Sequence, residues 1–223
     1  MIDAVTLLNR KPGMTVEAFQ RYWRHEHAAV IARLPGVERY VQSHPLAETY
    51  QGSNPACDGI AELWARDSQA FREIGKSTAY VAVQADEERF LDRTRIALVL
   101  TEEHVIEDGP VTTRGVKCLR LLKRKEGVTV EAFQDCWLGR YGPQIASLPA
   151  LERYVQCHAR RGAYADGRQP AYDGFDITWF ASRGAQRRAM QSTAHERATE
   201  IASDFLASSD CAQILATEHV IIP

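Results

Sequence analysis

The sequence predicts an α+β protein made of two copies of one βαββαβ unit, whose sheets pack face to face into a single barrel. Three observations carry this prediction. The segment Glu-Arg-Tyr-Val-Gln-Ser-His at residues 38–44 returns at residues 152–158 with one substitution. Seventeen of thirty positions are identical between residues 15–44 and 129–158, which indicates a duplicated unit. Within each copy, strand-like and helix-like patterns follow one another in the same order.

Each element of the first copy has a local signal. Thr15, followed by Glu17 and Ala18, is typical of a helix start, and apolar side chains then recur at helical spacing. The turn sequences Lys-Pro-Gly at residues 11–13 and Leu-Pro-Gly at residues 34–36 end the first strand and this helix. The predicted elements are strands at residues 2–9, 37–44, 58–65 and 95–106, and helical stretches at residues 15–34 and 67–91, the second with a break near Gly75.

The order βαββαβ is that of a ferredoxin-like unit. In such a unit both helices cover one face of four antiparallel strands, and we expect the other, bare face to carry Tyr40, Trp64 and Ile96. The sheet of the second copy is a natural cover for this face. We therefore expect two domains, residues 1–109 and residues 110–223, with a cavity between their sheets.

Composition limits the class of partner. Hydrophobic residues make up 45% of the chain and charged residues 25%, which is typical of a globular protein with a core. The formal net charge of −2 gives no electrostatic argument for binding nucleic acid or an anionic membrane. No apolar run approaches the ~20 residues of a membrane span. The five cysteines lack metal or redox spacing and no leader pattern precedes the first strand, so we expect free thiols and a cytoplasmic location.

Several short motifs follow one another along the first copy: Phe19-x-x-x-Trp23-x-x-x-His27, Leu34-Pro35-Gly36, Arg39-Tyr40, Asp58-Gly59 with Glu62-x-Trp64, and Glu103-His104-Val105. They resemble the motifs of EthD-domain proteins, which belong to the dimeric α+β barrel superfamily. The resemblance covers the chain twice, as a tandem duplication. It implies ferredoxin-like repeats with facing sheets. Relatives include accessory proteins of ether degradation, muconolactone isomerases, and enzymes that dehydrate or decarboxylate aromatic polyketides.

The candidate catalytic residues are His27, His44 and Tyr40. His27 lies on the apolar stripe of the first helix, where it is either a core histidine or a general acid/base. The resemblance implies the second role, and an imidazole with an ordinary pKa of about 6.5 suits proton transfer at neutral pH. Tyr40, Gln42 and His44 share one face of an alternating strand, so we expect them to point together into the cavity. The alternatives are that His44 bonds the following loop and that Tyr40 only lines the pocket.

The expected substrate-binding residues are Glu38, Gln42, Glu62, Trp64 and His104. The two copies differ here, because Tyr141 replaces His27 and Ile177 replaces Glu62. We therefore expect one working pocket in the first copy, with the second copy as lid, scaffold or degenerate site. Three arginines in a loop of the second copy are either solvated or recognise a substrate carboxylate; they are Arg160, Arg161 and Arg168.

The functional prediction is cofactor-independent acid–base chemistry (isomerisation, dehydration or decarboxylation) on a small, partly apolar, cyclic or aromatic molecule. His27 and His44 would exchange protons while Tyr40 orients a carbonyl or hydroxyl group. No metal is expected, because His25 and His27 are two apart on a helix and point away from each other. The alternatives are a non-catalytic binding protein of a catabolic oxygenase system and a cofactor-free monooxygenase. Beyond the small molecule, further pairing into a homodimer stays open.

Overall fold

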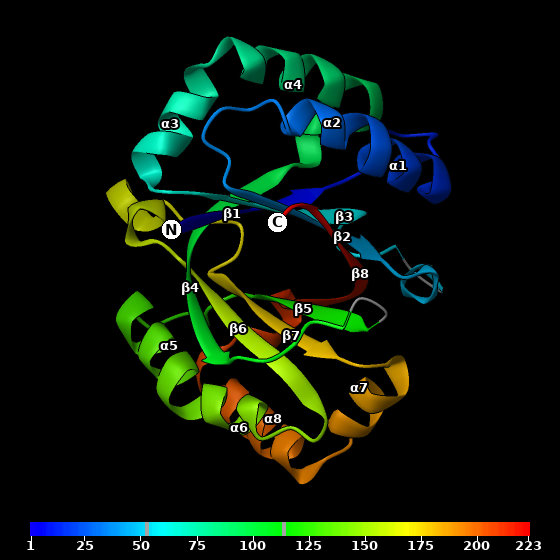
Figure 1. Ribbon diagram of the computed structural model, residues 1–223. Coiled ribbons are helices and arrows are strands. Elements are labelled where there is room, and N and C mark those ends of the chain that lie inside the picture. Colours follow the sequence, from blue (N-terminus) through cyan, green and yellow to red (C-terminus); the bar gives the residue numbers. More distant parts are fainter. Residues whose placement is uncertain (52–53, 113–114) are drawn as a thin grey trace. The chain divides into compact units, whose positions relative to one another are not determined.

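The computed structural model describes residues 1–51, 54–112 and 115–223. The chain folds into two compact units, shown in Figure 1. Unit 1 comprises Met1–Thr101 and Glu218–Pro223, and unit 2 comprises Glu102–Thr217. The units therefore correspond to the two sequence repeats, except that each repeat gives up its last strand segment to the other unit.

Unit 1 contains the predicted order of strands and helices. Thr15 caps the first helix, since its side chain accepts a hydrogen bond from the Ala18 backbone N–H. The predicted break near Gly75 falls at Ser77, which caps the next helix through the Tyr80 N–H. The elements are β1 (Ile2–Leu8), α1 (Val16–Tyr22), the π-helical turn η1 (Trp23–His27), α2 (Ala28–Ile31), β2 (Arg39–Pro45), the 3₁₀ turn η2 (Ala47–Tyr50), β3 (Gly59–Ala65), α3 (Ser68–Lys76), α4 (Thr78–Phe90), the 3₁₀ turn η3 (Arg93–Arg95) and β4 (Ala97–Glu107).

Unit 2 repeats this order, including the π-helical turn. A π turn widens the helix locally and often marks a functional position. No sequence pattern predicted it. The elements are β5 (Val116–Leu122), α5 (Val130–Cys136), the π turn η4 (Trp137–Tyr141), α6 (Gly142–Ala146), β6 (Leu151–Ala159), the 3₁₀ turn η5 (Arg161–Gly167), β7 (Gly174–Phe180), α7 (Arg183–Ala189), α8 (Thr193–Phe205), the 3₁₀ turn η6 (Ser208–Asp210) and β8 (Ala212–Ile222).

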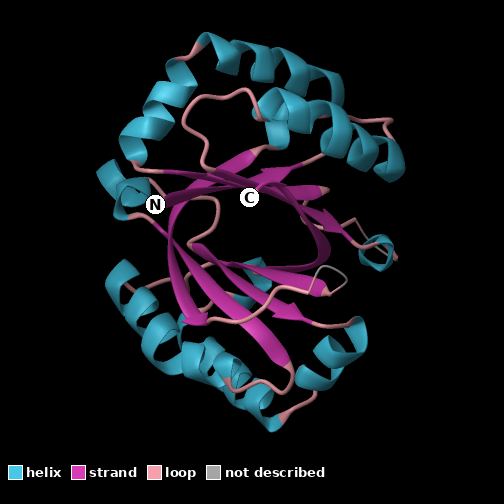
Figure 2. Ribbon diagram, viewed as in Figure 1, coloured by secondary structure: helices cyan, strands magenta, loops and turns pink. Residues whose placement is uncertain are grey.

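All strand pairs with a described register are antiparallel, and their registers match between the units except for an irregularity between Leu151 and Arg153 of β6. In unit 1, β3 lies between β1 and β2, and β1 also pairs with the start of β4. In unit 2, β7 lies between β5 and β6, and β5 pairs with the start of β8. The hydrogen-bonded order β1-β3-β2-β8-β5-β7-β6-β4 closes on itself, so the predicted α+β barrel is confirmed. In Figure 2 the helices of each unit form a layer on one face of its strands.

The last strand of each repeat is long enough to serve two units. Only the five residues Ala97–Thr101 of β4 pair with β1. The following residues of this strand belong to unit 2, and Glu218–Pro223 at the end of β8 belong to unit 1. An eleven-residue strand spans about 35 Å, well beyond a five-residue register. This exchange of strand ends determines which histidine side chains contact each other within each unit.

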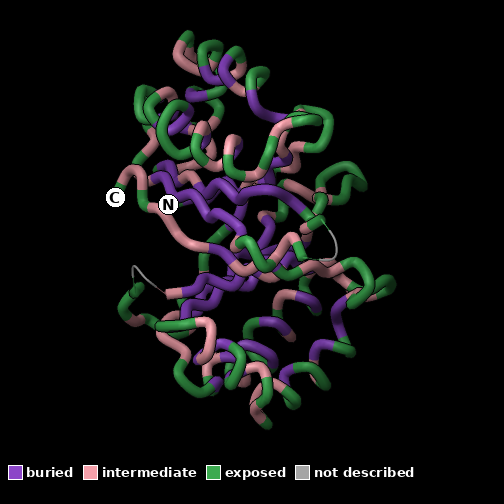
Figure 3. The backbone as a smooth tube through the Cα atoms, turned by 90° about the vertical axis from the view of Figure 1, so that its right-hand side faces the viewer, coloured by how far each residue is buried: buried purple, intermediate pink, exposed green. Residues whose placement is uncertain are grey.

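The core of unit 1 lies between its helices and its sheet. Phe19 packs against Trp23 and Phe90, with ring centroids 5.7 Å apart in both pairs. The Asp-Gly motif has a packing reason, because a Cβ atom at Gly59 would collide with the Trp23 ring. Figure 3 shows that the strands are largely buried, whereas the helices alternate between buried and exposed residues. No helix among the described residues is long and apolar enough to span a membrane.

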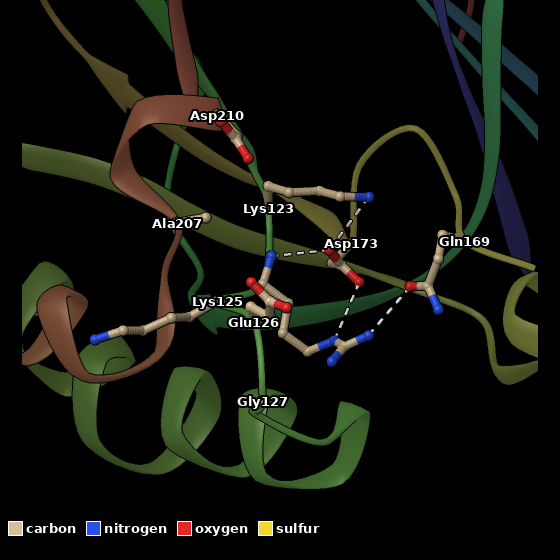
Figure 4. A pocket seen from close by; sticks show the side chains of 9 residues that line it. Lys123, Lys125, Glu126, Gly127, Gln169, Asp173, Ala207 and Asp210 are labelled. Carbon is tan, nitrogen blue, oxygen red and sulfur yellow. Dashed lines mark hydrogen bonds and ion pairs between the residues drawn. The ribbon is translucent and has the colours of Figure 1, made fainter.

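The aspartate of the same motif holds the loop after the first strand. In unit 2, Asp173 accepts hydrogen bonds from the Arg124 backbone N–H at 2.8 Å and from the Tyr164 hydroxyl at 2.8 Å. The Arg124 guanidinium lies beside it and donates to Gln169, along one wall of a polar hollow shown in Figure 4. Asp58 and Arg10 form the same pair in unit 1. Because both units have it, we interpret this pair as part of the fold.

Candidate active site

Unit 1 contains a cavity of about 620 Å³ between its helices and its sheet. The sequence predicted a cavity on the other face of the strands, between the two sheets, whereas the cavity in unit 1 lies on the helix face. The sheet residues Ala4, Thr6 and Ala61 have small side chains, which leave space for the cavity between the sheet and the helices. Most other lining residues are apolar: Leu8, Ile31, Leu34, Leu63, Phe71, Ile74, Val83, Ile96, Leu98 and Leu100.

His27 lies in the cavity wall, at the end of the π turn. Its side chain is buried, and Nδ1 lies 2.8 Å from Oδ2 of Asp86 on α4. Burial lowers the pKa of His27, and the attraction of Asp86 only partly opposes this. A neutral imidazole beside a carboxylate places its hydrogen on Nδ1. Asp86 is the one hydrogen-bond partner of this ring among the described residues, so Nε2 is the nitrogen left for a molecule in the cavity.

Asp86 is itself held in place. Its Oδ1 accepts a hydrogen bond of 2.7 Å from the Tyr22 hydroxyl. Both carboxylate oxygens are therefore engaged, one by His27 and one by Tyr22. The sequence analysis missed Asp86, although the duplication contained a signal: Tyr141 replaces His27 and Ile201 replaces Asp86, so the second copy lacks both partners.

Tyr40, Gln42 and His44 do point to one side of β2, toward the helices. The Gln42 amide donates hydrogen bonds to the Tyr40 hydroxyl at 2.8 Å and to the Trp23 carbonyl at 2.9 Å. Nε2 of His44 lies 2.9 Å from Oε1 of Gln42, and Nε2 donates because an amide oxygen can only accept. The Trp23 indole also donates to the Tyr40 hydroxyl, at 3.0 Å. Tyr40 lines the cavity, whereas Gln42 and His44 are not among its lining residues.

Unit 2 contains the same network. Gln156 donates to the Tyr154 hydroxyl at 2.7 Å and to the Trp137 carbonyl at 3.0 Å, and it accepts from His158 at 2.9 Å. His158 stacks on Trp137 with ring centroids 4.0 Å apart, as His44 stacks on Trp23 at 4.5 Å. Because this network is also present in the unit that lacks the His–Asp pair, we interpret it as stabilising the fold. The expected proton exchange between His27 and His44 is therefore not supported by the geometry.

Glu38, Glu62 and Trp64 lie away from the cavity. The register pairs Tyr40 with Leu63 and Arg39 with Trp64, and directly opposed residues share a face. Trp64 therefore lies on the sheet face opposite to Tyr40, and so does Glu62, which is two residues away in the same strand. This corrects the prediction that Tyr40 and Trp64 lie on the same face of the sheet. Glu62 accepts a hydrogen bond from the Ser43 hydroxyl at 3.1 Å. Glu38 is exposed at the start of the strand.

His104 was expected beside the first-copy site, and this was wrong. The strand exchange places His104 in unit 2, where its ring lies 4.4 Å from that of His158. Its counterpart His219 takes the place in unit 1, with its ring edge-on to His44 at 4.5 Å. The pKa values of His44 and His158 fall to about 3, first through burial and then through these histidine neighbours.

In unit 2 the positions that open the cavity carry larger side chains. Arg120 replaces Thr6 and Asp176 replaces Ala61, and these two face each other across β5 and β7. Arg120 donates a hydrogen bond of 2.8 Å to the Tyr141 hydroxyl. Asp176 accepts hydrogen bonds from the Trp137 indole at 2.8 Å and from the Tyr154 hydroxyl at 2.6 Å. Ala61, its equivalent in unit 1, has no side-chain acceptor. Unit 2 thus has larger, hydrogen-bonded side chains at positions where Thr6 and Ala61 line the cavity of unit 1.

The remaining candidates also lie outside the cavity. Arg160 pairs with Glu102 and Arg161 with Glu131, both as surface ion pairs, which supports the solvated-loop interpretation. His25 is exposed and His27 is buried, so the two do not converge on one ion.

Comparisons with known proteins agree with this architecture. A family model described as EthD domain matches residues 11–94. No curated protein matches the chain. Among solved structures, an anthrone oxidase-like protein has a TM-score of 0.69 at 11% identity, covering 99% of this chain and 93% of that one. A candidate monooxygenase from Fusobacterium nucleatum has a TM-score of 0.63 at 9% identity, covering 99% and 92%.

A third structure, a candidate monooxygenase from Lactobacillus acidophilus, has a TM-score of 0.57 at 13% identity, covering 99% of this chain and 93% of that one. At such identities the likeness concerns the fold alone. The family match covers the helix with the π turn, β2, β3 and α4, which are the elements that position His27, Asp86 and Tyr40. The chain thus contains an EthD domain at residues 11–94, in the first of its two repeats.

Proposed function

We propose that unit 1 binds a small, largely apolar molecule in its cavity and that His27 moves a proton on this molecule without a cofactor. The reaction would be an isomerisation, a dehydration or a decarboxylation. One observation carries the proposal: the His27–Asp86 pair lies in the wall of an apolar cavity, with one imidazole nitrogen held by the carboxylate and the other left for a ligand.

The geometry suits a general base. The lowered pKa of His27 keeps its imidazole neutral near pH 7, so Nε2 can accept a proton from a carbon or hydroxyl group of the substrate. The imidazolium that forms is then stabilised by the Asp86 carboxylate at 2.8 Å. In an isomerisation His27 returns the same proton to a second carbon, and in a dehydration it transfers the proton to the departing hydroxyl group.

Tyr40 has a positioning role in this proposal. Its hydroxyl oxygen accepts hydrogen bonds from both Trp23 and Gln42, which fixes the phenol in the cavity wall. Burial raises its pKa, so the phenol stays protonated. We assign a structural role to His44, because its hydrogen bond to Gln42 has an equivalent between His158 and Gln156 in unit 2. Unit 2 serves as scaffold, since larger side chains stand where the cavity of unit 1 opens.

The competing function is binding without chemistry, as in an accessory protein of an oxygenase system. The same cavity would serve both, so the test must detect proton removal directly. We would incubate the protein in D₂O with a panel of cyclic carbonyl compounds that have acidic C–H groups, and follow deuterium incorporation by NMR and mass spectrometry. We expect incorporation with the wild-type protein and a loss on the order of 10²-fold or more in His27→Ala.

His25→Ala is the matched control, because His25 is an exposed histidine in the same π turn. It should leave the exchange rate unchanged. Equal rates in His27→Ala and the wild-type protein would remove His27 from the chemistry. Binding of the panel without any exchange would favour the accessory function, and oxygen consumption with a reduced phenol would favour a monooxygenase. A cytoplasmic location and a homodimer remain predictions.

A further inference from the structure

Glu87 is a cavity-lining residue whose carboxylate has no close polar contact among the described residues. It follows Asp86 on α4 and shares its cavity-facing side with Tyr80 and Val83, at helical spacing. The residue is half-buried. Among the described residues, its carboxylate receives no hydrogen bond and forms no ion pair within 4 Å.

The groups around Glu87 are already occupied. Arg93, the cation on its side of the cavity, lies 3.3 Å from Oε1 of Glu88. Asp86 has both oxygens engaged by His27 and Tyr22, and it adds negative charge beside Glu87. Burial raises the pKa of Glu87, the charge of Arg93 opposes the rise, and Asp86 adds to it. No described group of the protein donates a hydrogen bond to this half-buried carboxylate, so a ligand that displaces water from it has to supply a donor.

We propose that Glu87 determines which molecules the cavity accepts, by receiving a hydrogen bond from a hydroxyl group on an uncharged and otherwise apolar ligand. This inference rests on the proposed function, because it takes the same cavity as the ligand site. It adds a second polar contact to that of His27, and the two groups would hold the ligand at separate points.

The charges in the cavity argue for an uncharged ligand, and therefore favour isomerisation or dehydration over decarboxylation, whose substrate carries a carboxylate. The imidazole of His27 is neutral, and the raised pKa values of Tyr40 and Tyr80 keep these two lining phenols neutral as well. An anionic group placed in the cavity would therefore meet the carboxyl group of Glu87 and be repelled by its negative charge. The two lining cations are exposed and already bonded, Arg93 to Glu88 and Arg72 to Gln69.

The second unit supports the assignment. The residue equivalent to Glu87 is Ala202, which is buried in α8. Glu87 is thus lost together with His27 and Asp86, in the unit where Arg120 and Asp176 take the place of Thr6 and Ala61. A carboxylate needed for the fold alone would be expected in both units.

The test uses three fluorescent probes with one bicyclic frame: naphthalene, 2-naphthol and 2-naphthoate. Binding is followed by the fluorescence anisotropy of each probe. We expect the wild-type protein to bind 2-naphthol at least about 10-fold more tightly than naphthalene, since hydrogen bonds to charged groups are among the stronger ones. The 2-naphthoate anion should bind most weakly. Glu87→Ala should remove the preference for 2-naphthol, and Glu87→Gln should improve the binding of 2-naphthoate.

Two controls locate the effect. Glu73→Gln removes an exposed carboxylate from the neighbouring helix α3, outside the cavity lining, and should leave all three affinities unchanged. The double variant Thr6→Arg with Ala61→Asp copies the residues of unit 2 into unit 1, and should abolish binding of all probes while circular dichroism shows that the protein is folded.

Several results would overturn the inference: failure of every probe to bind, no preference for 2-naphthol in the wild-type protein, or a preference that persists in Glu87→Ala or in the filled double variant. The proposed chemistry fails separately. If 2-naphthol selectivity depends on Glu87 but no compound exchanges deuterium, the ligand site stands and the proton-transfer role of His27 is wrong.

Discussion

The imidazole of His27 and the carboxylate of Asp86 are 59 residues apart in the chain and 2.8 Å apart in the structure. One comes from the π turn of the first helix and the other from the last turns of α4. The duplication makes this pair informative. The Tyr-x-Gln-x-His network occurs in both units, whereas the His–Asp pair occurs in unit 1, where it lies at the wall of the cavity, and is replaced by Tyr141 and Ile201 in unit 2. What the units share is interpreted as fold, and what only unit 1 has is interpreted as function.

Asp86→Asn should slow deuterium exchange on the order of 10²-fold while the protein stays folded. The amide offers His27 either an N–H or a carbonyl, so the imidazole loses its fixed tautomer, and the imidazolium loses its counter-charge. The measurement is the exchange rate constant at saturating ligand. Tyr22→Phe is the control, since it removes a hydrogen bond from Asp86 but leaves the pair with His27. A rate in Asp86→Asn within a factor of two of the wild-type rate would contradict the role of the pair.

The protein should lose stability as the pH falls from about 6.5 toward about 3. The pKa values of His44 and His158 are about 3 in the folded state. In the unfolded chain a histidine has a pKa of about 6.5, so between pH ~6.5 and ~3 the unfolded state binds more protons than the folded state. Stability is therefore full above pH ~6.5 and declines below it, by roughly 1–2 kcal/mol for each histidine at pH ~5.

Urea unfolding at pH 7 and pH 5 would measure this loss. The double variant His44→Phe with His158→Phe keeps an aromatic ring on each tryptophan but cannot titrate. Its stability at pH 7 should be lower, because the Gln42 and Gln156 carbonyls lose their donors. Its decline between the two pH values should be shallower. An equally steep decline in the variant would show that other groups cause the acid sensitivity.

Gly59→Ala should destabilise the protein by about 1–3 kcal/mol, the usual cost of overpacking. The added methyl group would meet the Trp23 ring, which is fully buried and stacked between neighbours, so it cannot move aside. Gly139→Ala is the matched control, because nothing lies within 4 Å of a methyl group there and the residue is helical. It should stabilise by about 0.5–1 kcal/mol. Chemical denaturation of both variants measures the difference, and equal effects would contradict the packing argument.

Asp176→Ala should cost about 3 kcal/mol or more of unfolding free energy, because the buried Trp137 N–H and Tyr154 hydroxyl lose their acceptor. Exchange by the folded fraction should remain, since we assign the chemistry to unit 1. Asp135→Ala, at an exposed helical position, should change the stability by less than about 0.5 kcal/mol. A loss of exchange per folded molecule as large as that in His27→Ala would place the second unit in the reaction.

Local features of the fold could be predicted because their causes are local. The caps at Thr15 and Ser77 depend on side-chain oxygens that bond N–H groups three residues away. The alternation of Tyr40, Gln42 and His44 depends only on the strand period. Features that depend on register and on distant residues were missed or wrong: the pairing of Arg39 with Trp64, the strand exchange that brings His219 to His44, and the partnership of Asp86 with His27.

By itself, the sequence determined that the chain is a duplicated βαββαβ unit and where its strands and helices lie. It also identified His27 and Tyr40 as candidate catalytic residues. The tertiary structure decided that a cavity lies between the helices and the sheet of unit 1, which repeat supplies each strand end, and which carboxylates reach this cavity. The physical reason is one of range. Capping, turns and periodicity are set by residues a few positions apart, whereas the cavity depends on the bulk of side chains at Thr6 and Ala61 opposite helices that come from other parts of the chain.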